Sequence, residues 1–123
     1  MAFLYQVRAD GPLPESWPIG EKACVVGRGD FADACVEDDA LSRSHFLIVR
    51  EGADYVLVDL NSANGTLVDG KRISACILAA DATITAGASV FYFSHSPVTP
   101  EVLAAIVPLA RVANAARPQA DAV

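Results

Sequence analysis

The sequence is poor in the residues that build metal centres, disulfide frameworks and nucleic-acid surfaces. Its 123 residues include only three cysteines and two histidines, and no C-x-x-C pair occurs, so we expect no metal site, no cofactor and no disulfide framework. Lys and Arg number 9 against 15 Asp and Glu, which gives a net charge of −6. An acidic surface argues against nucleic acid and anionic lipid as partners.

The sequence also lacks long apolar segments. No run reaches the roughly 18 apolar residues that cross a bilayer, and the N-terminus does not have the basic and apolar regions of a signal peptide. We therefore expect a cytoplasmic protein that does not associate with membranes.

Patterns typical of catalytic sites are missing as well. Ser44 and His45 are adjacent, so on a strand they would point to opposite faces and could not act as nucleophile and base. The neighbouring carboxylates Asp38 and Asp39 belong to an acidic run that we expect to be a solvated turn. There is no phosphate-cradling glycine loop. We predict that the protein is not an enzyme and has no catalytic residue.

Short strands separated by turn signals fill most of the chain. Hydrophobic residues make up 53% and charged residues 20%, which is enough for a core. Asn64-Gly65 and Asp69-Gly70 are strong turn signals, and three prolines in residues 9–18 predict a loop whose Trp17 folds back on the core. All three cysteines are expected in the core. This spacing predicts an all-β sandwich, with strands at residues 3–8, 22–26, 34–36, 46–50, 55–60, 66–68, 71–73, 77–78, 83–85 and 89–94.

The segment after residue 96 has a different pattern. Thr99 and Pro100 resemble a helix start, and apolar residues then recur at helical spacing as far as Ala113, with a kink expected at Pro108. We predict two parts, a sandwich domain at 1–96 and a helical extension with a frayed end at 97–123. The apolar stripe of the helix has two open roles: packing on its own domain, or forming a homodimer through residues 99–113.

Three polar segments stand at the ends of expected strands. They are Gly27-Arg28, the Ser-Arg-Ser-His of residues 42–45, and the Asn-Ser-Ala-Asn-Gly-Thr of residues 61–66. Loops on a rigid scaffold are where binding residues gather. Two arginines, a serine and an asparagine brought to one end of a sandwich would form a site for a small anion.

In their order and spacing, these segments resemble the signature of the forkhead-associated (FHA) domain family. That signature has Gly-Arg, then Ser-Arg-x-His, then Ser-x-Asn-Gly-Thr followed by x-Asn-Gly, and the resemblance covers roughly residues 3 to 95. It implies a β-sandwich of about eleven strands that binds phosphothreonine in partner proteins and has no catalytic activity. Asp69 stands where the family commonly has asparagine, and Ala79-Ala80-Asp81 replaces its usual Gly-Asp pair.

The resemblance also implies a role for individual residues. Phosphothreonine carries a charge of about −1.5 to −2 and three acceptor oxygens. Arg28, Ser42 and Arg43 match the positions that bind the phosphate, and Asn64 matches the asparagine that holds the ligand's main chain. Ala63 lies where a polar residue often touches the ligand, so here only its backbone is available. The residues expected to support the site are Gly27, His45, Gly65 and Thr66.

Each assignment has a simpler alternative. Arg28 could be an ordinary surface arginine, Ser42 could cap a turn, and Asn64 could serve turn geometry alone. Arg43 could pair with the acidic run at residues 37–39 instead of a ligand. We favour the ligand roles, because the residues occur together in one ordered pattern, but for Arg43 the two readings are evenly balanced.

The sequence thus predicts a phosphothreonine-dependent protein-binding module in the serine/threonine-kinase signalling of a bacterial cell. Its expected partner is a phosphorylated protein or peptide, either a kinase or a kinase substrate. The alternative is a phospho-independent scaffold or dimerisation module that uses the C-terminal helix.

Overall fold

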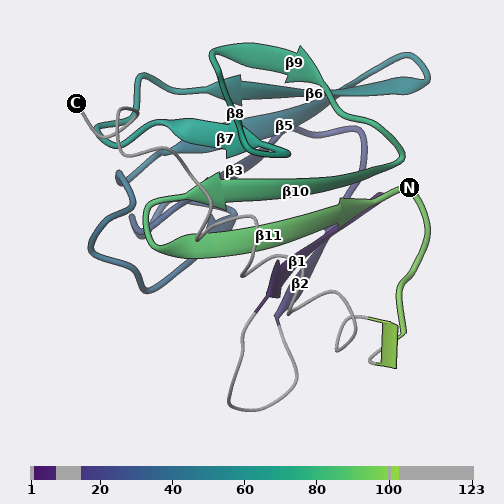
Figure 1. Ribbon diagram of the computed structural model, residues 1–123, viewed down its shortest axis with the longest axis horizontal. Coiled ribbons are helices and arrows are strands. Elements are labelled where there is room, and N and C mark those ends of the chain that lie inside the picture. Colours follow the sequence, from purple (N-terminus) through teal and green to yellow (C-terminus); the bar gives the residue numbers. More distant parts are fainter. Residues whose placement is uncertain (1, 8–14, 100, 103–123) are drawn as a thin grey trace.

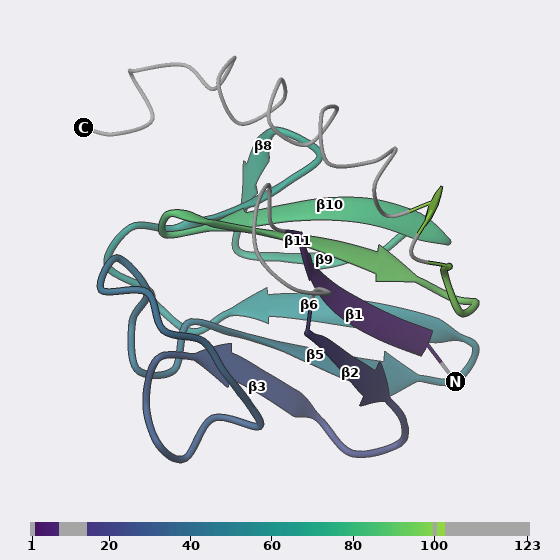
Figure 2. The ribbon, with the colours of Figure 1, turned by 90° about the horizontal axis from the view of Figure 1, so that it is seen from below.

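The computed structural model of the protein describes residues 2–7, 15–99 and 101–102, and these form a sandwich of two β-sheets (Figures 1 and 2). The strand order is β2-β1-β11-β10-β7-β8 in the six-stranded sheet and β4-β3-β5-β6-β9 in the five-stranded sheet. All pairings are antiparallel except that of β3 with the very short β4. The predicted all-β sandwich of about eleven strands is confirmed.

The strands agree with most of the predicted ranges to within two residues. Their bounds are β1 Ala2–Val7, β2 Ser16–Ile19, β3 Cys24–Gly27, β4 Ala34–Cys35, β5 Phe46–Glu51, β6 Asp54–Asp59, β7 Thr66–Val68, β8 Lys71–Ile73, β9 Ala75–Ile77, β10 Asp81–Ala86 and β11 Ser89–Ser94.

The core lies between the two sheets and is built by alternation along the strands. On β5, Phe46 and Ile48 are fully buried, whereas Leu47 and Val49, which alternate with them, are only half-buried. Phe91 on β11 faces Phe46 across the sandwich, with ring centroids 5.7 Å apart in an edge-to-face arrangement. The two sheets are therefore held together by large apolar side chains at the centre.

Residues 16–19 correct the prediction of a loop. They form β2, in which Trp17 pairs with Leu4 and Pro18 with Phe3. β2 is an edge strand, and an edge strand tolerates proline because one side of it makes no ladder bonds. Trp17 is half-buried against the core, as expected.

The expectation of three core cysteines is also wrong in part. Cys24 is buried and Cys76 half-buried, but Cys35 is exposed. Cys35 lies in the two-residue strand β4 at a sheet edge, where alternate side chains face solvent.

The two predicted turns differ in geometry. Asp69 and Gly70 both have positive φ (49° and 84°), so the predicted turn between β7 and β8 has the backbone of a type I′ turn. In the other turn only Gly65 has positive φ (80°), and the non-glycine residue with this conformation is Asn61 (φ 55°) rather than Asn64. Asn61, soon after the end of β6, thus adopts the left-handed conformation in this loop, and Asn64 does not. The Asn64 side chain makes a tertiary hydrogen bond instead.

The predicted C-terminal helix lies almost entirely outside the described residues. At its start, the Val102 N–H donates to the Thr99 hydroxyl over 3.3 Å, which is the expected capping contact. The rest of the helix and the homodimer surface at residues 99–113 stay predictions. Within the described ranges, no helix has the length and apolar character needed to cross a membrane.

Asp59, at the end of β6, organises the loop that leads into β7. Its carboxylate accepts hydrogen bonds from the hydroxyls of Ser62 (2.6 Å) and Thr66 (2.7 Å) and from the Ser62 N–H (3.1 Å). Burial by itself raises the pKa of this carboxyl, but these hydrogen bonds, helped by nearby His45, outweigh it and hold the pKa below the ordinary 3.8. The ionised carboxylate is therefore the form that holds the loop.

Removing the Phe91 ring should strongly destabilise the sandwich. We expect Phe91→Ala to lower the free energy of unfolding by about 3–5 kcal/mol, because a large side chain is lost from a fully packed position. Urea denaturation measures the change. Phe31→Ala is the matched control: Phe31 is fully exposed, so its loss should change stability by no more than about 0.5 kcal/mol. If the two variants changed the free energy of unfolding equally, Phe91 would not be a core residue of the kind described.

Asp59→Asn should destabilise the protein in a pH-dependent way. Because the folded-state pKa of Asp59 is depressed, its stabilisation is complete above the ordinary pKa of 3.8 and is lost as the pH falls through the folded-state value. We expect a loss of about 1–2 kcal/mol at pH 7, from hydroxyl donors left without an ionised acceptor. Denaturation curves recorded from pH 7 to strongly acidic pH should show that the difference in unfolding free energy between Asp59→Asn and wild type becomes smaller as the pH falls. The control is Asp54→Asn, an exposed position at the other end of β6, which should not show this pH dependence. If Asp59→Asn stays less stable than wild type by the same amount at acidic pH, the ionised carboxylate is not what holds the loop.

Candidate functional site

Arg28 follows β3 directly and is fastened to residues 41 and 42. Its backbone N–H donates to the Ser42 carbonyl (3.1 Å), and its side-chain Nε donates to the Leu41 carbonyl (2.7 Å). The side chain is nevertheless exposed. Its terminal guanidinium nitrogens form no hydrogen bond with another described residue, so one edge of the guanidinium is anchored and the other is available to a ligand.

Gly27 makes this arrangement possible. A Cβ at this position would collide with the carbonyl oxygen of Arg43 and lie 2.8 Å from that of Ser42. The strand β3 and the segment at 42–43 pass so close to each other that only glycine fits between them. The structure thus places Gly27, Arg28, Ser42 and Arg43 side by side, as the sequence pattern suggested.

The loop between β6 and β7 is joined to the same segment. The Ala63 N–H donates to the Ser42 hydroxyl oxygen (3.0 Å), and the Asn64 side-chain amide donates to the Ala40 carbonyl (2.7 Å). Ser42 accepts in this contact, so its own O–H remains able to donate. Consecutive residues 40, 41 and 42 therefore each bind a residue of another predicted segment, and all three polar segments meet there.

His45 lies fully buried beneath this junction. Its Nδ1 accepts the Ser42 N–H (3.0 Å), and its Nε2 donates to the Gly65 carbonyl (2.8 Å). The Ser42 donor assigns the proton to Nε2. Both ring nitrogens are used within the protein, so His45 supports the two loops and is not free to act as a ligand or a general base.

Gly65 and Thr66 complete the support of the second loop. Gly65 has positive φ, its N–H donates to the Ser62 hydroxyl (3.0 Å), and the Arg72 guanidinium lies against its Cα, where an added Cβ would be 2.9 Å from Arg72 Cζ. Thr66 is fully buried and bound to Asp59. Asp59 is not among the predicted site residues, although an aspartate three residues before Ser62 is a pattern for side-chain-to-backbone bonding in turns.

The acidic run at residues 37–39 is not simply a solvated turn. The Asp38 carboxylate accepts the Ala40 N–H (2.9 Å), the Ala88 N–H (2.9 Å) and the Ser89 hydroxyl (2.7 Å). It thereby ties the loop before Ser42 to the turn between β10 and β11. Within the described residues, the Arg43 side chain forms no ion pair with residues 37–39, so the alternative role for Arg43 is not what the structure shows.

An open cleft of about 350 Å³ lies beside this junction. It is lined by the two arginines together with Ser44 and the loop that follows β3 (Arg28, Gly29, Asp30, Phe31, Ala32, Arg43 and Ser44). The pattern Ser-Arg-Ser-His could have indicated Ser44, whereas nothing local in the sequence pointed to Phe31. The cleft brings two cationic side chains to one surface of an acidic protein, which suits a small anion.

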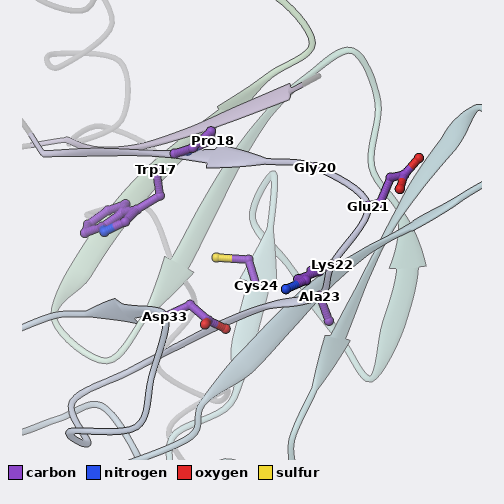
Figure 3. Close-up of a pocket in the computed structure, with 8 residues that line it drawn as sticks. All are labelled: Trp17, Pro18, Gly20, Glu21, Lys22, Ala23, Cys24 and Asp33. Carbon is purple, nitrogen blue, oxygen red and sulfur yellow. The ribbon is translucent and has the colours of Figure 1, made fainter.

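A second hollow, of about 370 Å³, lies between the edge strand β2 and the start of β3 and holds none of the predicted site residues (Figure 3). The Trp17 ring, the Cys24 thiol and the Asp33 carboxylate surround it. Burial and, to a lesser degree, the nearby Asp33 charge raise the pKa of Cys24 to about 11. Cys24 is therefore a neutral thiol at pH 7 and is not a reactive nucleophile.

The polar groups of the junction are already satisfied within the protein where they are buried. Among the residues that the structure describes, no group of His, Cys, Asp and Glu could hold a metal ion, and no buried side-chain nitrogen or oxygen lacks a hydrogen-bond partner. The donors available near the cleft are the terminal nitrogens of the arginines and the Ser42 hydroxyl, and the cleft also contains the Asp30 carboxylate. Such donors match the acceptor oxygens of an anion.

Curated proteins with similar sequences come from mycobacteria. The chain is 34% identical over 83 residues to the FHA domain-containing protein FhaA of Mycobacterium tuberculosis, a match that covers 68% of this chain and 16% of FhaA. It is 32% identical over 77 residues to the transcriptional regulatory protein EmbR of the same species, covering 63% of this chain and 19% of EmbR. The match therefore spans less than a fifth of these relatives.

Solved structures and a family model agree with this similarity. An FHA domain solved in work on phosphothreonine-dependent FHA interactions superimposes with a TM-score of 0.71 at 29% identity, covering 79% of this chain and 98% of that one. EmbR solved with a low-affinity phosphopeptide gives 0.71 at 31% identity, covering 80% of this chain and 25% of EmbR. The family model described as the FHA domain matches residues 24–87, which include all three polar segments. This chain belongs to the FHA domain family.

Proposed function

We propose that the chain is a phosphothreonine-dependent protein-binding module that reads the products of serine/threonine kinases in the bacterial cytoplasm, and that it binds without catalysing a reaction. The observation that carries the proposal is that Arg28 and Arg43 line the same cleft. Ser42, whose hydroxyl can donate, directly precedes Arg43 in the sequence. Two guanidinium groups and a hydroxyl supply charge-assisted donors for the three oxygens of a phosphate.

Each predicted ligand residue has an atom available for this role. Arg28 contributes its terminal nitrogens, Arg43 its exposed guanidinium and Ser42 its O–H. Asn64 uses its amide to reach Ala40, and its side-chain oxygen is left to accept a main-chain N–H of the ligand. Ala63 donates its own N–H to Ser42, so it acts through the backbone by fixing the orientation of that hydroxyl.

The relatives support the class of partner. EmbR has been solved with a phosphopeptide, and a second similar FHA domain comes from work on phosphothreonine-dependent interactions. By analogy we propose a phosphorylated protein, either a kinase or a kinase substrate, as the partner of this chain. The binding unit would be the sandwich at residues 1–96, and residues 97–123 would form an extension.

Replacing Arg28 tests the proposal directly. We expect Arg28→Ala to weaken binding to a phosphothreonine peptide library by about 10- to 150-fold, since a charge-assisted contact contributes about 1.5–3 kcal/mol. Isothermal titration calorimetry with the phosphorylated library and its unphosphorylated counterpart measures the effect. Wild type should bind only the phosphorylated pool.

The matched control is Arg50→Ala. Arg50 is an exposed arginine near the opposite end of β5 from His45, and its Nε donates to the Gly52 carbonyl (3.0 Å). This variant changes the net charge by the same amount as Arg28→Ala but should leave affinity within about twofold of wild type, because a surface charge away from the site is largely screened. Equal loss in both variants, or no phospho-dependence in wild type, would disprove the phosphate site.

A second candidate is a homodimer formed through residues 99–113. It is motivated by the start of the predicted helix, where Thr99 caps Val102 and the Val102 side chain is 48% exposed. If the helix pairs with a second copy, light scattering should give a dimer mass for the full chain and a monomer mass for residues 1–97. A monomer mass for both proteins would eliminate the dimer.

A further inference from the structure

Phe31 stands out among the phenylalanines because it contributes nothing to the core. Its side chain is fully exposed, with a relative accessibility of 101%, whereas Phe46, Phe91 and Phe93 are fully buried. An aromatic ring left in water forgoes the stabilisation that burial would provide. Its surface is therefore available to be covered by something other than the fold.

The loop that carries Phe31 is held in place by two backbone hydrogen bonds at Gly29. The Ala32 N–H donates to the Gly29 carbonyl (3.1 Å) and closes a turn with Asp30 and Phe31 at its tip. The Gly29 N–H in turn donates to the Arg43 carbonyl (3.1 Å). Phe31 is presented by a short turn bonded directly to the proposed phosphate-binding segment, so binding against it would require little ordering of the backbone.

Phe31 also shares its cleft with the proposed phosphate ligands. The same hollow of about 350 Å³ is lined by Arg28, Arg43 and Phe31. An extended peptide advances roughly 3.3 Å per residue. A peptide whose phosphate meets the arginines would consequently bring a residue only a few positions away against the Phe31 ring.

The charges beside the ring restrict which residue that can be. Asp30 precedes Phe31 at the tip of the turn and would repel an acidic side chain. Arg28 and Arg43 line the same cleft, but the bound phosphate balances their charge, so they do not select the charge of a flanking side chain. A neutral apolar side chain is not repelled by Asp30 and gains from burial against the ring.

We propose that Phe31 forms an apolar subsite next to the phosphate site and selects phosphothreonine ligands with an aliphatic or aromatic side chain close to the phosphothreonine. This inference rests on the proposed function and adds a recognition element to it. The aromatic ring supplies the contact area, and the turn that holds it supplies the fixed position relative to the arginines.

The test uses the full chain and a set of phosphothreonine peptides that differ at one flanking position at a time, with leucine, serine, aspartate or lysine there. Fluorescence anisotropy gives the Kd of each peptide. For wild type, leucine at one or two positions should strengthen binding about tenfold over serine, as expected for burying a branched side chain. Phe31→Ala should abolish this preference and leave the Kd of the all-serine peptide within about twofold. Phe31→Leu should retain part of it.

Ile77→Ala is the matched control for loss of an exposed apolar side chain. Ile77 is 65% exposed on the edge strand β9 and does not line the cleft, so its variant should keep the leucine preference. Urea denaturation should confirm that Phe31→Ala is folded.

The two possible failures are distinguishable. If wild type and Phe31→Ala bind the phosphorylated peptides with the same flanking profile, the subsite is disproved while the phosphate site stands. If wild type binds no phosphorylated peptide, the proposed function is disproved, and the subsite with it.

Discussion

The rest of the site depends on the two hydrogen bonds made by the buried imidazole of His45. It accepts the Ser42 N–H and donates to the Gly65 carbonyl, so one side chain fixes two loops that are far apart in the sequence. The ring is fully buried and both nitrogens are used, which makes the position intolerant of residues without two opposed polar atoms. With Ser42 and Gly65 held, the residues around them have little freedom left.

Residues 40–42 connect the three polar segments by accepting hydrogen bonds from the other two. The Leu41 and Ala40 carbonyls hold the Arg28 and Asn64 side chains, and the Ser42 hydroxyl holds the Ala63 N–H, so the three polar segments assemble on this short stretch of chain. Gly27 allows the close approach that this requires. The donors that remain face outward in positions already set, which lowers the ordering cost of capturing an anion.

The acidic balance of the protein does not conflict with an anion site. Asp38 and Asp59 lie next to the site in the fold, but their carboxylates accept hydrogen bonds from backbone N–H groups and hydroxyls of the surrounding loops. Their charge is thereby partly compensated by local dipoles. The guanidinium groups of Arg28 and Arg43 line the cleft without a carboxylate partner among the described residues, and the site is locally cationic in a chain with net charge −6.

Much of this could be predicted from the order of amino acids alone, because the relevant signals are local. Turn residues and alternation located most of the strands, Asp69-Gly70 specified its hairpin turn, and the spacing of three polar segments identified the family. Other features depend on partners distant in the sequence. Asp38 binds Ala88 and Ser89, Pro18 is accommodated because its strand lies at an edge, and Phe31 shares a cleft with Arg43. A local pattern cannot reveal such features, since strand pairing within each sheet and packing of the two sheets are what bring those residues together.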